Sequence, residues 1–133
     1  MSLHPYRIPI EQMIERYQKL YTAAINDIFQ ERGLHDRWLG PDIKCRTKDL
    51  SVEVVAGFAF TVQWVFDPPP ATEKQRAAKM VESYPAGGMI VVDTGADEVS
   101  GFWGELATTV CLRHGVRGAV INGGAKDSGF VKK

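Results

Sequence analysis

The sequence predicts an α/β fold built on a parallel strand–helix–strand (βαβ) core unit between residues 88 and 127. Two apolar runs, residues 89–92 and 118–121, have the length and composition of buried strands. A stretch with helical periodicity separates them and stops at Gly115. Strands joined by a crossover helix are parallel, and the crossover is right-handed in nearly all cases, so these observations describe one unit.

Length and composition exclude several classes of protein. A chain of 133 residues, 44% hydrophobic and 24% charged, is expected to form a single globular domain, residues 1–133. Sixteen basic and sixteen acidic residues cancel, so electrostatics favour neither nucleic acid nor an anionic membrane as a partner. With no long apolar run and no signal-like N-terminus, a cytoplasmic location is expected. Cys45 and Cys111 lack metal-site spacing, and no disulfide between them is expected in a reducing compartment.

The first half of the chain predicts helices. Residues 1–9 are polar and contain prolines, which indicates an arm. Apolar residues between 10 and 30 recur at steps of three and four, and the stretch is long enough for two helices. Thr22 is a candidate N-cap for the second helix, and Gly33 is a candidate C-cap. Residues 34–50 are irregular, and residues 43–47 within them are a candidate short edge strand.

The longest strand signal lies between residues 52 and 66, where apolar residues nearly alternate. Gly57 marks a bulge or a close approach of another backbone. Three prolines, residues 68–70, end this strand. Thr72 and Gln75 resemble a capping box, and the helix they would start is closed by residues 85–88. Its apolar side would carry Ala77, Ala78, Val81 and Tyr84.

The ends of the two strands in the βαβ unit carry the candidate site. Because parallel strands end at the same edge of a sheet, residues 93–97 and 122–127 should be neighbours. The helix N-terminus lies at that edge too, so free amides, carboxylates and one cation converge where ligands bind in open α/β sheets. The helix stripe expected to pack on the sheet is Trp103, Leu106, Ala107, Val110, Cys111 and His114.

The residue types at this edge suit a small anion and a metal. Gly104 would let a ligand approach the backbone, and the first-turn amides of Glu105 and Leu106 would suit a carboxylate. Lys126 would be its second anchor. Asp127 could hold a divalent cation directly, with Glu105 and Asp97 reaching it through water.

Structural explanations exist for the same residues. Asp93 and Asp97 favour turns, as do the glycines at 123 and 124. Glu105 and His114 each complement the helix dipole at their own end of the helix. Lys126 and Asp127 could form a solvated pair.

Taken together, these motifs resemble the RraA-like family. The matching pieces of the βαβ unit are residues 91–93, 95–97, 104–106 and 126–127, with the spacing from Glu105 to Lys126 kept. Residues 20–27 are similar to the family's first helix, and residues 56–62 to its Gly-x-Ala-x-Thr-Val strand. The family includes metal-dependent class II aldolases that cleave 4-hydroxy-4-methyl-2-oxoglutarate and related acids, and also a regulator of ribonuclease E.

The resemblance implies a swivelling β/β/α domain that assembles as homo-trimers or hexamers with sites between subunits. It implies that the amides of Glu105 and Leu106 bind the carboxylate of a small 2-oxo acid and that Lys126 grips its oxygens. Asp127 would ligate Mg²⁺ or Mn²⁺, which would polarise the keto group for carbon–carbon cleavage to pyruvate. Oxaloacetate decarboxylation is expected with it, and Glu105 would orient a water for proton transfer.

The sequence departs from the family pattern at four points, and these departures leave more than one function open. Lys126 stands in place of arginine, Asn122 where enzymes often have aspartate, and Phe130 where active aldolases usually carry an acid. Relatives continue past the position of Lys133, so the domain is expected to lack the family's C-terminal segment. Asp127 favours an enzyme, whereas Lys126 and Phe130 favour a non-catalytic regulator of RNA degradation or an altered substrate. A third alternative is an assembly subunit without a site.

Overall fold

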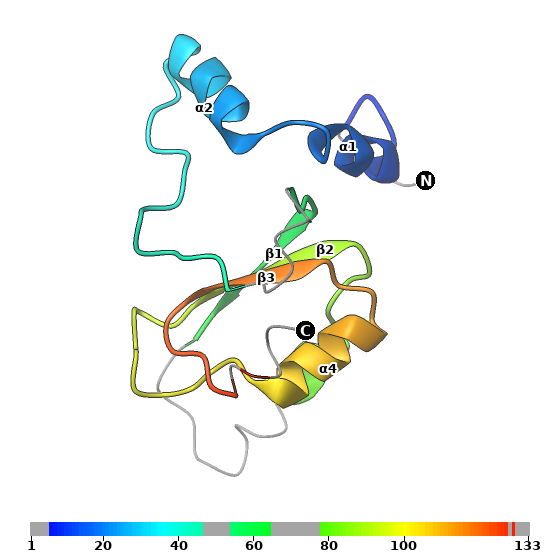
Figure 1. Cartoon of the computed structure of the whole chain (residues 1–133). Coiled ribbons are helices and arrows are strands. Elements are labelled where there is room, and N and C mark those ends of the chain that lie inside the picture. The colour runs from blue at the N-terminus through cyan, green and yellow to red at the C-terminus, as the bar shows by residue number, and fades with distance from the viewer. Residues whose placement is uncertain (1–5, 47–53, 65–77, 128, 130–133) are drawn as a thin grey trace.

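The computed structural model of this chain describes residues 6–46, 54–64, 78–127 and 129 (Figure 1). It is a mixed α/β structure, as predicted. Residues 78–82 are also helical. The named elements are α1 (Ile10–Tyr17), α2 (Thr22–Glu31), β1 (Phe58–Gln63), β2 (Gly88–Asp93), α4 (Glu105–Arg113) and β3 (Gly118–Asn122).

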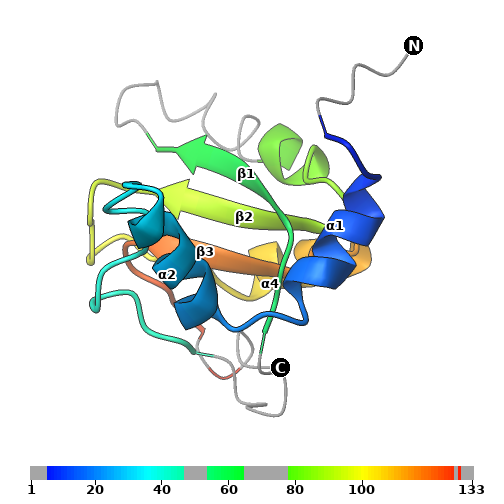
Figure 2. The same ribbon diagram turned by 90° about the horizontal axis from the view of Figure 1, so that it is seen from above.

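The three strands form one parallel sheet in the order β1-β2-β3. The predicted parallel pairing of the βαβ unit is therefore confirmed. In the register, Asp93 pairs with Gln63 on one side and with Asn122 on the other, so all three strands end at one edge. Helices α1 and α2 lie on one face of the sheet and α4 on the other (Figures 1 and 2).

The core lies between the sheet and α4. Along the central strand β2, Gly88, Ile90 and Val92 are buried in alternation, and Ile90 has no exposed surface. This alternation directs one face of the strand into the core. The buried cluster is Tyr84, Ile90, Val92, Trp103, Cys111 and Val116.

Glycine fulfils three of the predicted roles. A Cβ at Gly57 would lie 2.7 Å from the carbonyl oxygen of Gly87, so this glycine permits a close approach of two backbones. Gly33 has φ +69° and ends α2, with the amide of Leu34 donating to Phe29 at 2.8 Å. Gly115 ends the helix before β3 in the same way, with φ +71°. Both helices end in the Schellman arrangement that favours glycine after the last turn.

Three details of the predicted elements are wrong. The N-cap of α2 is Tyr21, because its backbone is still extended while Thr22 is already helical, and neither side chain caps the helix. Residues 43–46 form no strand; they are a loop over β3 with no ladder partner in the described part of the chain. Within the described part of the 52–66 strand signal, the strand covers Phe58–Gln63, and residues 54–57 before it carry no ladder.

Other predictions fall outside the described residues: the three prolines at 68–70, the capping box at Thr72 and Gln75, and residue 47. No helix among the described residues is long and apolar enough to cross a membrane.

Burial of Tyr84 gives a testable pH dependence. Desolvation, followed by the nearby Cys111 thiol, raises the pKa of Tyr84 from 10.0 to about 12. The folded state keeps this proton at pH values where the unfolded chain loses it, so the stabilisation is full below pH 10 and is lost as the pH rises toward about 12. We expect Tyr84→Phe to make the free energy of unfolding fall less steeply across this range, as measured by urea denaturation. Equal slopes for both proteins would contradict this.

Candidate functional site

The two loops that follow β2 and β3 are joined by hydrogen bonds at the sheet edge. Asn122 Nδ2 donates to Asp93 Oδ1 at 2.9 Å. Thr94, which is buried, donates to the carbonyl oxygen of Asn122 from its amide at 3.1 Å and from Oγ1 at 2.6 Å. The prediction that these two strand ends are neighbours is confirmed.

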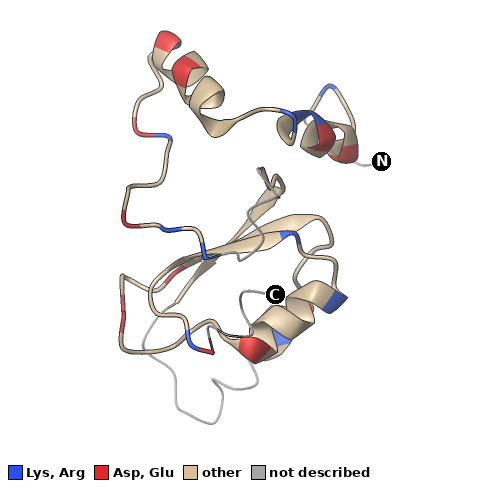
Figure 3. Ribbon diagram, viewed as in Figure 1, with Lys and Arg blue, Asp and Glu red and all other residues tan. Residues whose placement is uncertain are grey.

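The pairing continues into the chain that leads to α4. The amide of Gly124 donates to Asp97 O at 2.8 Å, and the amide of Phe102 donates to Gly124 O at 3.1 Å. Trp103 and Ala125 form a parallel bridge, and the amide of Lys126 donates to Trp103 O at 2.8 Å. This ladder places residues 126 and 127 beside the first turn of α4, where acidic and basic segments meet in Figure 3.

Lys126, Asp127 and the N-terminus of α4 meet over Gly104. Gly104 is the N-cap of the helix, with φ −160°. A Cβ on this residue would lie 2.7 Å from Asp127 Oδ2 and 3.0 Å from Lys126 Cγ. The amide nitrogen of Glu105 lies 3.4 Å from the same Asp127 oxygen. The close approach expected at Gly104 is therefore made by the chain's own side chains.

Three of the predicted site side chains are accessible. Glu105, Lys126 and Asp127 are exposed. Among the described residues, no carboxylate forms an ion pair with Lys126. Asp127 has φ +55°, a left-handed conformation that aspartate tolerates better than most residues. The site thus presents a cation and a carboxylate to solvent beside the first turn of α4.

The predicted packing of Leu106 against the sheet is wrong. Its side chain is 80% exposed, whereas Trp103 and Cys111 from the same predicted stripe are buried. The helix begins at Glu105, so Trp103 lies before it and does not share the helical phase of Leu106. Trp103 is held instead by its indole Nε1, which donates to Thr108 Oγ1 at 3.0 Å.

Asp97 is engaged in its own loop. Its Oδ1 accepts hydrogen bonds from the amides of Val99 at 2.8 Å and Ser100 at 3.0 Å. The pKa of Asp97 is held below its ordinary value of 3.8 by hydrogen bonds. The largest effect comes from the side chain of Ser100, followed by the backbone amides of Ser100 and Val99. Asp93 likewise accepts from the amide of Gly95 at 3.0 Å. For both aspartates, these contacts are the ones expected of a residue that stabilises a turn.

Removal of the Asp97 carboxylate has an expected pH signature. A depressed pKa means that the ionised carboxylate stabilises the folded state above about pH 3.8 and that this contribution is lost as the pH falls through the folded-state pKa. We expect Asp97→Ala to melt a few degrees below the wild type at neutral pH, with the difference narrowing below pH 3.8. Calorimetry at both pH values measures it, and a difference independent of pH would contradict the carboxylate's role.

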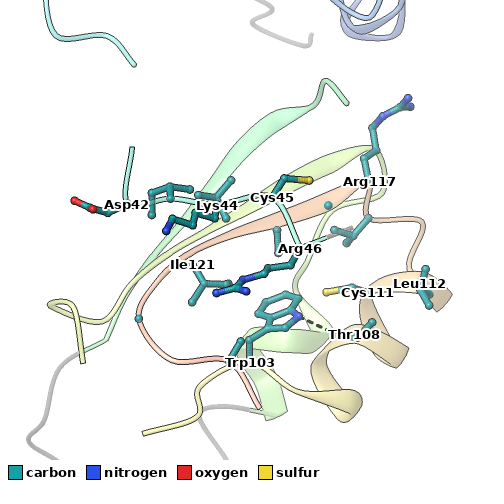
Figure 4. A pocket seen from close by; sticks show the side chains of 17 residues that line it. Asp42, Lys44, Cys45, Arg46, Trp103, Thr108, Cys111, Leu112, Arg117 and Ile121 are labelled. Carbon is teal, nitrogen blue, oxygen red and sulfur yellow. Dashed lines mark hydrogen bonds between the residues drawn. The ribbon is translucent and has the colours of Figure 1, made fainter. Parts of the chain in front are cut away.

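A separate hollow of about 850 Å³ lies between residues 42–46 and the β3–α4 layer (Figure 4). Its apolar floor includes Trp103 and Ile121, and Arg46 reaches into it toward Trp103. No pattern in the sequence predicts this hollow, because no periodicity connects the 42–46 loop to β3. Cys45 and Cys111 both line it as free thiols, and Cys111 is buried as expected.

Comparison with known proteins assigns the family. The family model for RraA-like proteins (Aldolase/RraA) matches residues 22–133. The chain belongs to the RraA-like family. The resemblance inferred from the motifs is thereby confirmed, and with it the fold class.

Individual RraA-like relatives are longer than this chain. Protein DlpA of Legionella pneumophila is 29% identical over 106 residues, which are 80% of this chain and 16% of DlpA. A structure described as a novel cellulase from gut-associated microbes is 28% identical, with a TM-score of 0.80 over 98% of this chain and 58% of its own. RraAS2 of Streptomyces coelicolor, an unusual member of the RNase ES inhibitor RraA family, is 19% identical with a TM-score of 0.72, and this likeness shows the fold alone. The match covers 97% of this chain and 61% of RraAS2.

Proposed function

We propose that this RraA-like chain belongs to a divalent-metal-dependent class II aldolase. Its substrates would be 2-oxo acids of the 4-hydroxy-4-methyl-2-oxoglutarate type, cleaved to pyruvate, with oxaloacetate decarboxylation as a second activity. The observation that supports this most is the meeting of Lys126, Asp127 and the first amide of α4 over Gly104. A 2-oxo acid needs those three partners: amide donors, a cation, and a carboxylate able to hold a metal.

The first turn of α4 would bind the substrate carboxylate. The first amides of a helix have no carbonyl partner within it and lie at the positive end of its dipole. In α4 these include the amides of Glu105 and Leu106. Lys126 would add a full positive charge beside them and hold the oxygens of the 2-oxo acid. It lacks the planar fork of arginine, so it would act as a point charge rather than as a bidentate clamp.

The donor set fits a hard cation such as Mg²⁺ or Mn²⁺. These ions are commonly bound through one or two carboxylates, with substrate oxygens and water as the other ligands. Asp127 is an exposed carboxylate at the site, and no cluster of three or more His, Cys, Asp or Glu gathers among the described residues. Asp127 would be the direct ligand, with Glu105 and Asp97 acting through water. When bound, the metal would polarise the 2-oxo group as a Lewis acid.

Proton transfer would be assisted by Glu105. Its side chain is exposed in the first turn of α4, one residue after the glycine over which Lys126 and Asp127 meet. From there the carboxylate would orient a water that delivers the proton to the carbon left by cleavage or decarboxylation.

One observation favours a second candidate, a non-catalytic protein that regulates RNA degradation. Asp127 Oδ2 lies next to the amide of Glu105, so this carboxylate could serve only to cap α4. The family includes both aldolases and ribonuclease regulators. In either case we propose a cytoplasmic homo-trimer or hexamer. This chain spans 56–61% of the length of the solved relatives.

A direct assay separates the two candidates. The protein is incubated with oxaloacetate and Mg²⁺ or Mn²⁺, and pyruvate is measured with and without a chelator. The aldolase proposal expects pyruvate formation above the metal-only background that disappears with the chelator. Turnover equal to that background in all samples would leave the regulator as the better candidate.

A further inference from the structure

Two glycines form a flat surface under the side chain of Lys126. A Cβ at Gly101 would lie 3.0 Å from Lys126 Cβ, 3.0 Å from Cδ and 3.1 Å from Cγ. A Cβ at Gly104 would lie 3.0 Å from Cγ and 3.2 Å from Cε of the same lysine. We call Gly101 and Gly104 the glycine shelf. The methylene stem of Lys126 lies so close to this shelf that a Cβ on either glycine would force the stem to shift.

The backbone of the shelf does not itself require glycine. The glycines with positive φ are 33, 87, 95, 115 and 123, and Gly101 is not among them. Gly104 has an extended backbone with φ −160°. Any residue can adopt these conformations, so the reason for glycine at 101 is the space that Lys126 occupies.

We propose that Gly101 is a positioning residue for Lys126, an inference that rests on the proposed function. The lysine is held from two sides: its amide donates to Trp103 O at 2.8 Å, and its stem packs on the shelf. A free lysine stem samples many rotamers, and ordering it on ligand binding costs affinity. The shelf removes part of that cost by fixing the stem beforehand and directs the ammonium group toward the start of α4.

The kinetic test compares two glycine-to-alanine variants. Gly101→Ala places a methyl group against the lysine stem, whereas Gly40→Ala is the matched control, because a Cβ at Gly40 meets nothing within 4 Å. We expect Gly101→Ala to raise the KM for oxaloacetate about tenfold, the loss of one ordinary charged contact, with a much smaller change in kcat. Gly40→Ala should match the wild type. In a Lys126→Ala background, Gly101→Ala should have no further effect on KM.

A second measurement does not depend on activity. The lysines are dimethylated with isotope-labelled formaldehyde, and the methyl signals are followed by NMR, with Lys126 assigned from Lys126→Arg. In the wild type, we expect the relaxation of the Lys126 methyl signal to indicate a more ordered group than the signal of exposed Lys79. In Gly101→Ala, we expect the Lys126 signal to become as mobile as that of Lys79. This signal decides the positioning role even in a protein without turnover, so it is separable from failure of the proposed function.

The outcomes are distinct. An ordered Lys126 signal in the wild type supports the shelf even where Gly101→Ala does not fold. A Lys126 signal as mobile as that of Lys79 in the wild type would overturn the proposal. Equal KM values for Gly101→Ala and Gly40→Ala in an active enzyme would overturn it as well.

Discussion

Asp127→Ala is expected to lower metal-dependent oxaloacetate decarboxylation by about 100-fold or more. Mutation of a residue that only supports a metal ligand typically lowers metal affinity or activity by about 10–100-fold. Removal of the direct ligand itself should have at least the upper value of that effect. The measurement is pyruvate formation at saturating Mn²⁺. Asp27→Ala, which removes an exposed carboxylate from α2, is the matched control and should behave as the wild type.

Asp127→Asn separates metal binding from helix capping. Its side-chain oxygen can still accept the hydrogen bond from the amide of Glu105, but it carries no charge for a cation. The aldolase proposal expects this variant to be as inactive as Asp127→Ala while melting close to the wild type. Turnover near the wild-type rate in Asp127→Asn would show that Asp127 only caps the helix and would contradict its role as a metal ligand.

Gly123→Ala is expected to destabilise the protein by about 2–4 kcal/mol, through strain at a disfavoured backbone conformation and a steric overlap. Gly123 has φ +154°, and a Cβ there would overlap Thr94 Oγ1 and lie 3.0 Å from the carbonyl oxygen of Asp97. Neither neighbour can move freely. Thr94 Oγ1 donates a hydrogen bond to Asn122 O, and Asp97 O accepts one from the amide of Gly124. Urea denaturation measures the change in the free energy of unfolding.

A double variant tests whether the overlap with Thr94 is the cause. Thr94→Ala removes the hydroxyl that a Cβ at residue 123 would meet. Each single variant should destabilise the protein, and the double variant should be more stable than the sum of the two effects predicts. Strict additivity would show that the two loops are not packed as described.

The parts of this fold that the sequence predicted depend on local rules. The glycines at 33 and 115 end helices because the residue after the last turn adopts a left-handed conformation. The meeting of Asp93 and Asn122 follows from parallel strands alone, since such strands end at the same edge. The convergence of Lys126 and Asp127 on the helix start follows from the same rule.

The parts that the sequence did not predict depend on where one segment meets another. Leu106 was misplaced because the helix starts two residues after Trp103, a boundary that periodicity does not fix. Gly101 was passed over because its neighbour in space, Lys126, is 25 residues away in the chain. Residues 43–46 have strand-like composition but no partner in the described part of the chain.

We propose that Lys126, Asp127 and the first turn of α4 form one ligand site. Amide NMR spectra recorded during titration with paramagnetic Mn²⁺ and pyruvate test it most directly, without any need for turnover. We expect the amides of residues 104–106 and 126–127 to broaden first and Asp127→Asn to abolish this broadening. Broadening centred elsewhere in the chain, or retained in Asp127→Asn, would contradict it.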